Sequence, residues 1–143
     1  MQLAAVPCIE LLAGWGSQKE DVMFLNNWDS IEDMKGDFWP GYSENEKYSG
    51  ELEGAKVFLA SYGTPSYEGY AFVLFERNGR LFEVEGSHCS CYGLEGQWDP
   101  EETTVQSLRH RVDAGKLGDG RYDCNPFAEE LRMVLNALPA NVK

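Results

Sequence analysis

Basic residues are scarce in this chain of 143 residues, where 12 Lys and Arg stand against 24 Asp and Glu and give a formal net charge of −12. Binding to DNA or RNA begins with Lys and Arg side chains that displace counterions from phosphates. We therefore expect no direct contact with nucleic acids or with anionic membranes. The acidity fits two interpretations equally well: solubility, or a surface that complements a basic partner or imitates a phosphate backbone.

Targeting and membrane signals are also missing. The first residues lack the basic and long apolar regions of a secretory signal, and no run of about 18 apolar residues is present that would cross a membrane. We therefore expect a cytoplasmic protein. The cysteines are Cys8, Cys89, Cys91 and Cys124, and we expect free thiols because the cytosol is reducing.

Common catalytic signatures are absent from the sequence. It has no Gly-rich phosphate loop, no pair of histidines at helical spacing and no nucleophile-elbow pentapeptide. Because none of these is present, we favour a binding or inhibitory protein over an enzyme.

The acidity is concentrated in the N-terminal half. Between Glu20 and Glu53 the chain has ten acidic residues and two lysines. We predict that this stretch binds a basic surface on a nucleic-acid-binding protein, and that Trp39, beside Pro40 in a polar loop, is an exposed aromatic anchor. The predicted partner-binding residues are Glu32, Asp33, Asp37, Trp39, Tyr42, Glu44 and Glu46.

Local signals predict short helices and a loop in this half. Ser17-Gln18-Lys19-Glu20 has the spacing of a capping box, and it predicts a short helix over residues 22–25. Residues 29–34 predict another helical turn that stops at Gly36. Residues 37–54 are rich in Gly, Ser, Asn and acids, and we expect an exposed loop.

The middle of the chain predicts an antiparallel meander of at least three strands. Residues 55–62, 70–76 and 80–85 are rich in β-branched and aromatic side chains. Asn78-Gly79 separates the last two strands and is a strong hairpin signal, because both turn residues must accept positive φ.

Two helices are predicted to follow. Asp99-Pro100-Glu101-Glu102 has an N-cap residue, a first-turn proline and acids typical of a helix start, and Asn125-Pro126 predicts a second start. The expected architecture is a single α+β domain with an acidic part (1–54), a β-meander (55–85), a Cys loop (86–98) and C-terminal helices (99–143). The basic residues at 109–111 are expected to pair with internal acids such as Glu101 or Glu102.

The Cys loop is the segment where we expect any chemistry. His88, Cys89 and Cys91, with Cys124 as a fourth ligand, offer the sulfur and nitrogen atoms that Zn²⁺ binds, although the Cys-x-Cys spacing differs from that of common zinc knuckles. A second interpretation is a thiol nucleophile activated by His88 or His110, but acidic surroundings raise a thiol pKa.

The simplest interpretation of the same loop needs no cofactor. Cysteines often serve as small buried apolar side chains, and Tyr92 and Trp98 would then pack over the sheet. Elemental analysis for zinc distinguishes this interpretation from a metal site. Self-association is a third possible role for the whole chain.

The segment Gly-Ser-His-Cys-Ser-Cys-Tyr-Gly-Leu-Glu-Gly-Gln-Trp at residues 86–98, followed by Asp-Pro-Glu-Glu-Thr, resembles a segment of small uncharacterised proteins from phages and mobile elements. The resemblance covers residues 70–104, about a quarter of the chain. It implies an accessory protein directed at a host, in the host cytoplasm, such as an anti-CRISPR-like inhibitor of a defence system. It implies no particular activity.

Overall fold

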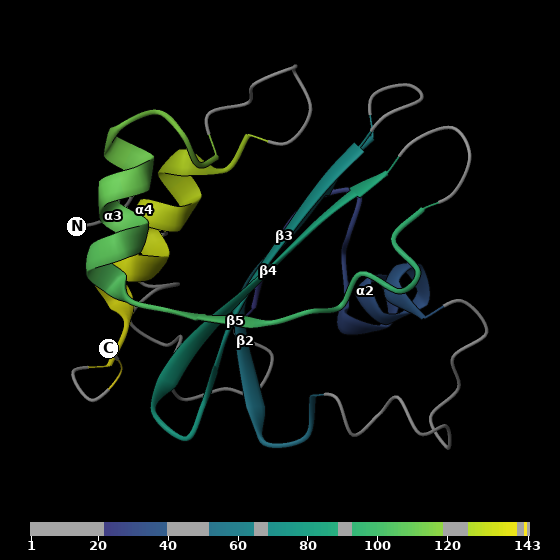
Figure 1. Cartoon of the computed structure of the whole chain (residues 1–143), viewed down its shortest axis with the longest axis horizontal. Helices are drawn as coiled ribbons and strands as arrows, with labels where there is room; N and C mark the ends of the chain where they lie inside the picture. The colour runs from purple at the N-terminus through teal and green to yellow at the C-terminus, as the bar shows by residue number, and fades with distance from the viewer. Residues whose placement is uncertain are drawn as a thin grey trace, which may run out of the picture.

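The protein contains one five-stranded sheet with helices on both of its faces (Figure 1), which confirms the predicted α+β class. The computed structural model describes residues 22–39, 52–64, 69–88, 93–118, 126–139 and 142. Helix α2 covers one face of the sheet, and helices α3 and α4 cover the other. The elements are β1 (Met23–Asn26), α2 (Ile31–Phe38), β2 (Ala55–Gly63), β3 (Gly69–Arg77), β4 (Arg80–His88), β5 (Glu101–Thr103), α3 (Val105–Asp113) and α4 (Ala128–Ala137).

The antiparallel meander β2–β3–β4 is confirmed. Asn78 and Gly79 have φ angles of 58° and 81°, as the hairpin signal requires, and the Gly79 N–H donates to Glu76 Oε2 at 2.7 Å. Strand β4 continues to His88, beyond its predicted end. Residues 86–88 therefore belong to the sheet rather than to the Cys loop.

The helix predicted over residues 22–25 is wrong, because Met23–Asn26 is strand β1, which pairs in parallel with β2. Its side chains alternate between the two faces. Met23 and Leu25 pack with the core under α3 and α4, whereas Val22 and Phe24 pack with the core under α2. A continuous apolar run of this kind suits a strand that is covered on both faces. The capping box that suggested a helix lies outside the described residues.

Helix α2 passes through Gly36, where the sequence predicted a stop. Its start is capped by Ser30, whose hydroxyl accepts from the Asp33 N–H. Met34 and Phe38 lie one turn apart and are fully buried, so their burial outweighs the roughly 1 kcal/mol cost of glycine in a helix. The exposed loop predicted from residue 37 is wrong for its first two residues, which are helical, and residues 40–51 lie outside the described chain.

The helix start predicted at residues 99–102 is also wrong. Glu101–Thr103 instead forms β5, which pairs with β4 at Leu81↔Thr103 and Glu83↔Glu101. Helix α3 begins afterwards, where the Thr104 hydroxyl accepts from the Ser107 N–H at 3.0 Å. The pairing of two distant segments therefore overrides a local helix signal.

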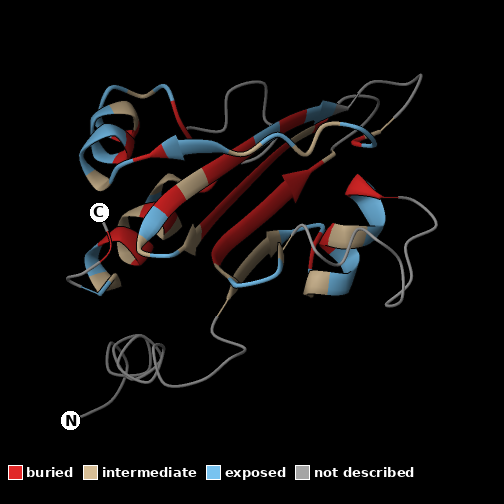
Figure 2. Ribbon diagram, turned by 60° about the horizontal axis from the view of Figure 1, so that its bottom comes forward, coloured by how far each residue is buried: buried red, intermediate tan, exposed pale blue. Residues whose placement is uncertain are grey.

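The sheet separates two apolar cores. On β3, Phe72 and Leu74 face α3 and α4, whereas Val73 and Phe75 face α2. Figure 2 shows the resulting buried central strands between helices with exposed outer sides. The last two helices bury one face each against the sheet, through Leu108 and Val112 of α3 and Leu131, Val134 and Leu135 of α4.

Strand β2 contains a bulge at Phe58. The register runs from Val57↔Phe75 to Leu59↔Leu74, so Phe58 has no partner on β3. Phe58 and Leu59 consequently both belong to the core under α3 and α4. None of the described helices is long and apolar enough to cross a membrane.

Candidate functional site

The carboxylates predicted for partner binding on α2 are exposed, but two of them also have structural roles. Asp33 Oδ2 accepts from the N–H of Asp29, the residue before the Ser30 cap, at 2.9 Å, which fixes the chain at the start of the helix. Asp37 Oδ2 accepts from Trp28 Nε1 at 2.6 Å. Glu32 is exposed and makes no hydrogen bond or ion pair with a described residue, so it is the carboxylate of α2 most available to a partner.

The prediction that Trp39 is an exposed anchor is wrong. Trp39 is 8% exposed, and its ring centroid lies 6.1 Å from that of Phe38 and 5.2 Å from that of Trp98. The Trp39 indole packs between the end of α2 and Trp98, the last residue of the predicted Cys loop. Trp39 therefore joins two segments that are distant in the sequence. Tyr42, Glu44 and Glu46 lie outside the described residues.

Residues 93–98, the last part of the predicted Cys loop, run back along the sheet beside β4, and we call them the strap. Leu94 is 1% exposed, and Trp98 stacks on Phe75 at 5.8 Å with an interplanar angle of 13°. The prediction that Trp98 packs over the sheet is thus confirmed. A Cβ on Gly86 would lie 3.0 Å from Leu94 Cδ2, so a glycine at this position lets the strap approach β4 closely.

The side chain of Gln97 fixes the strap to β4. Its Oε1 accepts from the Ser87 N–H at 2.9 Å, and its Nε2 donates to the Ser87 carbonyl at 2.7 Å and to the Gly93 carbonyl at 2.8 Å. One side chain therefore connects the described residues on the two sides of the loop tip. Sequence reasoning missed Gln97, because a single glutamine carries no pattern that marks such a role.

The metal-site prediction concerns residues that the structure mostly leaves undescribed. Cys89, Cys91 and Cys124 lie outside the described residues, and only the backbone of His88, opposite Gly69, is placed. Within the described residues, no group of three or more His, Cys, Asp or Glu side chains could hold a metal ion. Zinc binding stays a prediction, and so does thiol catalysis, for which only the exposed His110 is described.

Glu95 in the strap and Asp99 directly after it add exposed carboxylates to the segment that runs beside α2. In Figure 1 the strap runs beside α2, and Trp98 contacts Phe38 at a centroid distance of 5.1 Å. We call the exposed carboxylates on this side the acidic face. Its residues are Asp29, Glu32, Asp33, Asp37, Glu95 and Asp99.

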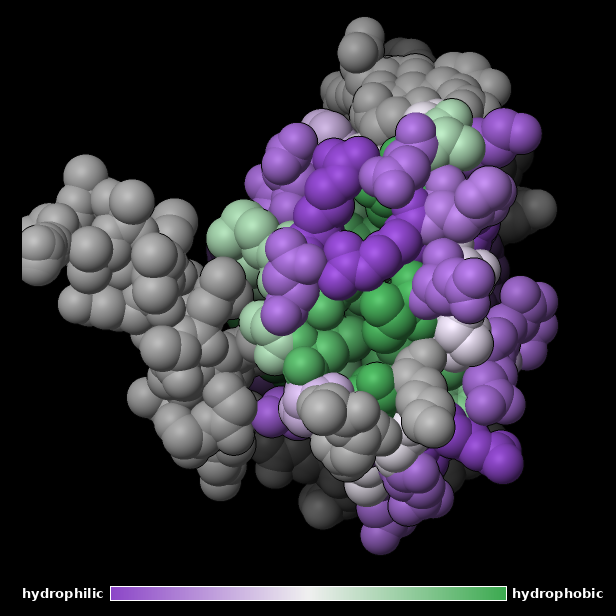
Figure 3. Space-filling model, turned by 90° about the vertical axis from the view of Figure 1, so that its left-hand side faces the viewer, coloured by the Kyte–Doolittle hydropathy of each residue, from purple (hydrophilic) through white to green (hydrophobic). Residues whose placement is uncertain are grey.

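The opposite side, formed by α3 and α4, has no such excess of acid. The described residues 105–118 and 126–139 contain four Lys and Arg and three Asp and Glu. Several of these charges are paired locally, since Arg132 lies 3.2 Å from Asp113 and 3.3 Å from Glu129. Figure 3 shows this side, where apolar side chains gather beneath an arc of hydrophilic ones. The two sides therefore differ clearly in charge.

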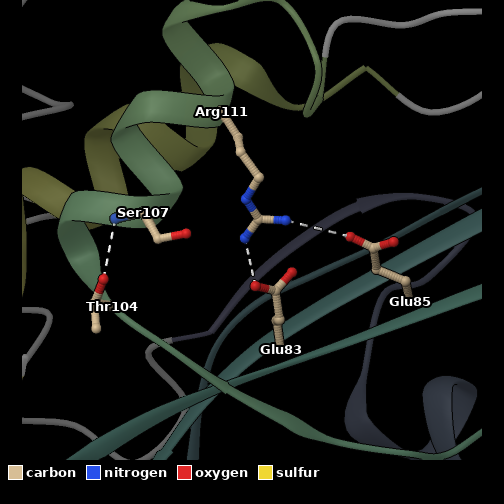
Figure 4. Close-up of polar contacts among 5 residues, drawn as sticks. All are labelled: Glu83, Glu85, Thr104, Ser107 and Arg111. Carbon is tan, nitrogen blue, oxygen red and sulfur yellow. Dashed lines mark hydrogen bonds and ion pairs between the residues drawn. The ribbon is translucent and has the colours of Figure 1, made fainter.

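A polar cluster joins α3 to the sheet (Figure 4). Arg111 Nη2 bonds the carboxylate of Glu83, and Arg111 Nη1 lies 3.7 Å from Glu85 Oε2. Burial, together with the charge of Glu83, raises the pKa of Glu85 against the opposing effects of Tyr70 and Arg111. Burial and the neighbouring Glu85 also raise the pKa of Tyr70 above its usual range, so its phenol stays protonated.

This cluster corrects the pairing predicted for the basic residues at 109–111. Arg111 pairs with Glu83 and Glu85 rather than with Glu101 or Glu102, because α3 lies over β4 and directs this side chain onto it. Glu102 lies instead 3.7 Å from Arg80. The cluster is best understood as an attachment of the helical layer to the sheet.

Compared with known proteins, the chain shows no significant match to a family model, a curated protein or a solved structure.

Proposed function

We propose that this chain is a small acidic binding protein that docks its acidic face on a basic surface of a nucleic-acid-binding protein. The observation that carries the proposal is the convergence of exposed carboxylates from α2 and from the strap on one side of the sheet, opposite a side with balanced charge. Carboxylates spread over a rigid surface can occupy the positions that phosphates take on a basic groove.

Electrostatic complementarity would act mainly on the rate and specificity of docking. Opposite charges steer association and suppress wrong partners, and their effect falls as salt screens them beyond roughly 8–10 Å. A bound acidic protein would compete with nucleic acid for the same basic surface and so inhibit the partner. The resemblance of residues 86–98 to proteins of phages and mobile elements supports a bacterial defence protein as this partner, in the manner of an anti-CRISPR inhibitor.

The test compares two charge-reversal variants in affinity capture from a bacterial host extract. Glu32→Lys, Glu95→Lys and Asp99→Lys together change the acidic face at residues that make no hydrogen bond or ion pair with described residues. The matched control makes the same change in charge on the other side of the sheet. Its substitutions are Asp113→Lys, Glu129→Lys and Glu130→Lys.

The wild type and the control should retain a nucleic-acid-binding protein that elutes with increasing salt, and the acidic-face variant should lose it. Circular dichroism checks that both variants are folded, because surface ion pairs such as those lost in the control contribute at most about 1 kcal/mol each. Equal capture by the two variants would contradict the proposal, as would capture of proteins without affinity for nucleic acid.

A further inference from the structure

Asn78 is exposed at the tip of the hairpin between β3 and β4, and its side-chain amide makes no hydrogen bond with a described residue. The other asparagines that the structure describes differ in this respect. Their amides bond other side chains, in the pairs Asn26–Ser61, Asn27–Thr64 and Asn136–Arg109. Among the described asparagines, Asn78 is therefore the one whose amide can rotate and react without loss of a contact.

The residue after Asn78 favours a reaction between its backbone and the Asn78 amide, since asparagine is one of the thermolabile residues of proteins. Gly79 has no Cβ, so no side chain shields its backbone nitrogen. When this nitrogen attacks Asn78 Cγ, the new N–Cγ bond closes a five-membered succinimide ring. The Cγ–NH2 bond breaks, and the amide nitrogen leaves as ammonia with the proton of the Gly79 N–H. Water then opens the ring at either carbonyl, which gives aspartate or isoaspartate at position 78.

The folded hairpin opposes the first step of this reaction at the attacking nitrogen. The Gly79 N–H donates to Glu76 Oε2 at 2.7 Å, so a carboxylate holds the proton that the nitrogen must lose. The negative charge of Glu76 also disfavours a second negative charge on that nitrogen. The turn adds a conformational restraint, because Asn78 and Gly79 both have positive φ in a two-residue loop that the pair Arg77↔Arg80 closes.

We propose that Asn78-Gly79 is a site of spontaneous deamidation through a succinimide, and that the Glu76 carboxylate restrains this reaction in the folded protein. The consequence is a slow and irreversible change of the hairpin. Isoaspartate adds a backbone methylene to the turn, which then no longer matches the register at Arg77↔Arg80. The isoaspartate form should therefore be less stable than the original chain. This inference concerns the hairpin tip and does not depend on the acidic face.

Peptide mapping of the full chain by mass spectrometry tests the site. The folded protein is incubated at a mildly alkaline pH and digested with chymotrypsin at intervals. Deamidation raises the mass of the peptide that contains Asn78, because OH replaces NH2, and chromatography separates the aspartate and isoaspartate products. Asn78 should react faster than Asn26, Asn27 and Asn136, whose amides are bonded. A rate at Asn78 no higher than at these three asparagines would overturn the proposal.

Substitutions of Glu76 test the restraint. Glu76→Ala should speed the reaction at Asn78 by roughly tenfold or more, which corresponds to the loss of a hydrogen bond to a charged group. Glu76→Gln keeps an acceptor for the Gly79 N–H without the charge, so its rate should lie between those of the wild type and Glu76→Ala. The matched control is Glu102→Ala, an exposed carboxylate 3.7 Å from Arg80, and it should leave the rate unchanged. An unchanged or lower rate in both Glu76 variants would contradict the proposal.

A variant that lowers global stability away from the turn separates a local restraint from unfolding of the whole chain. Arg111→Met removes the ion pair between α3 and Glu83 and leaves the hairpin tip intact. If the folded protein reacts locally at Asn78, this variant should deamidate at the rate of the wild type. Acceleration by Arg111→Met equal to that by Glu76→Ala would overturn the proposal, because Asn78 would then react only in unfolded molecules.

Discussion

Replacement of Arg111 by methionine should destabilise the protein more than replacement of its partner Glu83 by glutamine. Without Arg111, the carboxylate of Glu83, whose side chain is 10% exposed, is left unpaired beside Glu85. Removal of one partner of a buried ion pair costs about 3–5 kcal/mol. Because the Arg111 side chain is 30% exposed, water can partly replace it as a partner of Glu83. We therefore expect Arg111→Met to lower the free energy of unfolding by about 3 kcal/mol, the lower end of this range.

The substitution Glu83→Gln should lower the free energy of unfolding less than Arg111→Met does. Its amide oxygen still accepts from Arg111, and Glu85 remains 3.7 Å from the guanidinium, so the loss is about 1 kcal/mol, as for an ordinary hydrogen bond. The double variant should be more stable than the sum of the two losses predicts, because a neutral glutamine does not leave a buried charge without its partner.

Urea unfolding followed by tryptophan fluorescence, to which the buried Trp28 contributes, gives these free energies. Arg132→Met is the control, because the ion pairs of Arg132 with Asp113 and Glu129 join largely exposed side chains and should contribute less than about 1 kcal/mol. If Arg111→Met lowers the free energy of unfolding no more than Arg132→Met does, the cluster does not attach α3 to the sheet in the way we describe.

Three further substitutions test single features of the fold. The raised pKa of Glu85 means that the folded state takes up its proton more readily than the unfolded state does, so its contribution to stability is gained as the pH falls through that pKa and lost as the pH rises above it. Glu85→Gln should therefore raise the urea midpoint at neutral pH and change it little in acid, and a lower midpoint at neutral pH would contradict this. Gly118→Ala should lower the melting temperature more than Gly115→Ala. Both glycines have positive φ, but of the two only Gly118 would place a Cβ 2.9 Å from backbone and ring atoms. Equal decreases in melting temperature would exclude a steric cause. Thr104→Ala removes the hydroxyl that caps α3 and should cost about 1 kcal/mol in thermal unfolding, whereas Thr104→Ser should retain most of that stability.

The sequence predicts the fold best where local signals determine the structure. Asn78-Gly79 fixes a hairpin through the backbone preferences of two residues, and the apolar stripe of α4 marks its buried face. Prediction fails where a distant segment decides the outcome. The apolar residues of β1 are compatible with either a short helix or a strand, and only pairing with β2 and cover on both faces select the strand.

In the candidate site, too, sequence reasoning succeeds for features that local residues determine and fails for features that depend on distant segments. Local charge identifies Glu32 as an exposed acid, but it cannot show that the segment with Glu95 and Asp99 runs beside α2. Trp39 was expected to be exposed because polar residues surround it in the sequence. Its burial depends on the ring of Trp98, which comes from a segment that sequence reasoning treats separately.

The parallel pairing of β1 with β2 has a consequence for the order in which the protein folds. The β3–β4 hairpin joins neighbouring residues, whereas β1 can join β2 only after the chain between them, including α2, has crossed one face of the sheet. Long-range pairings of this kind form late, because their loops must close first. The carboxylates of α2 are therefore carried by a segment whose pairing forms late, and α2 should be the first described helix to detach when the native protein opens.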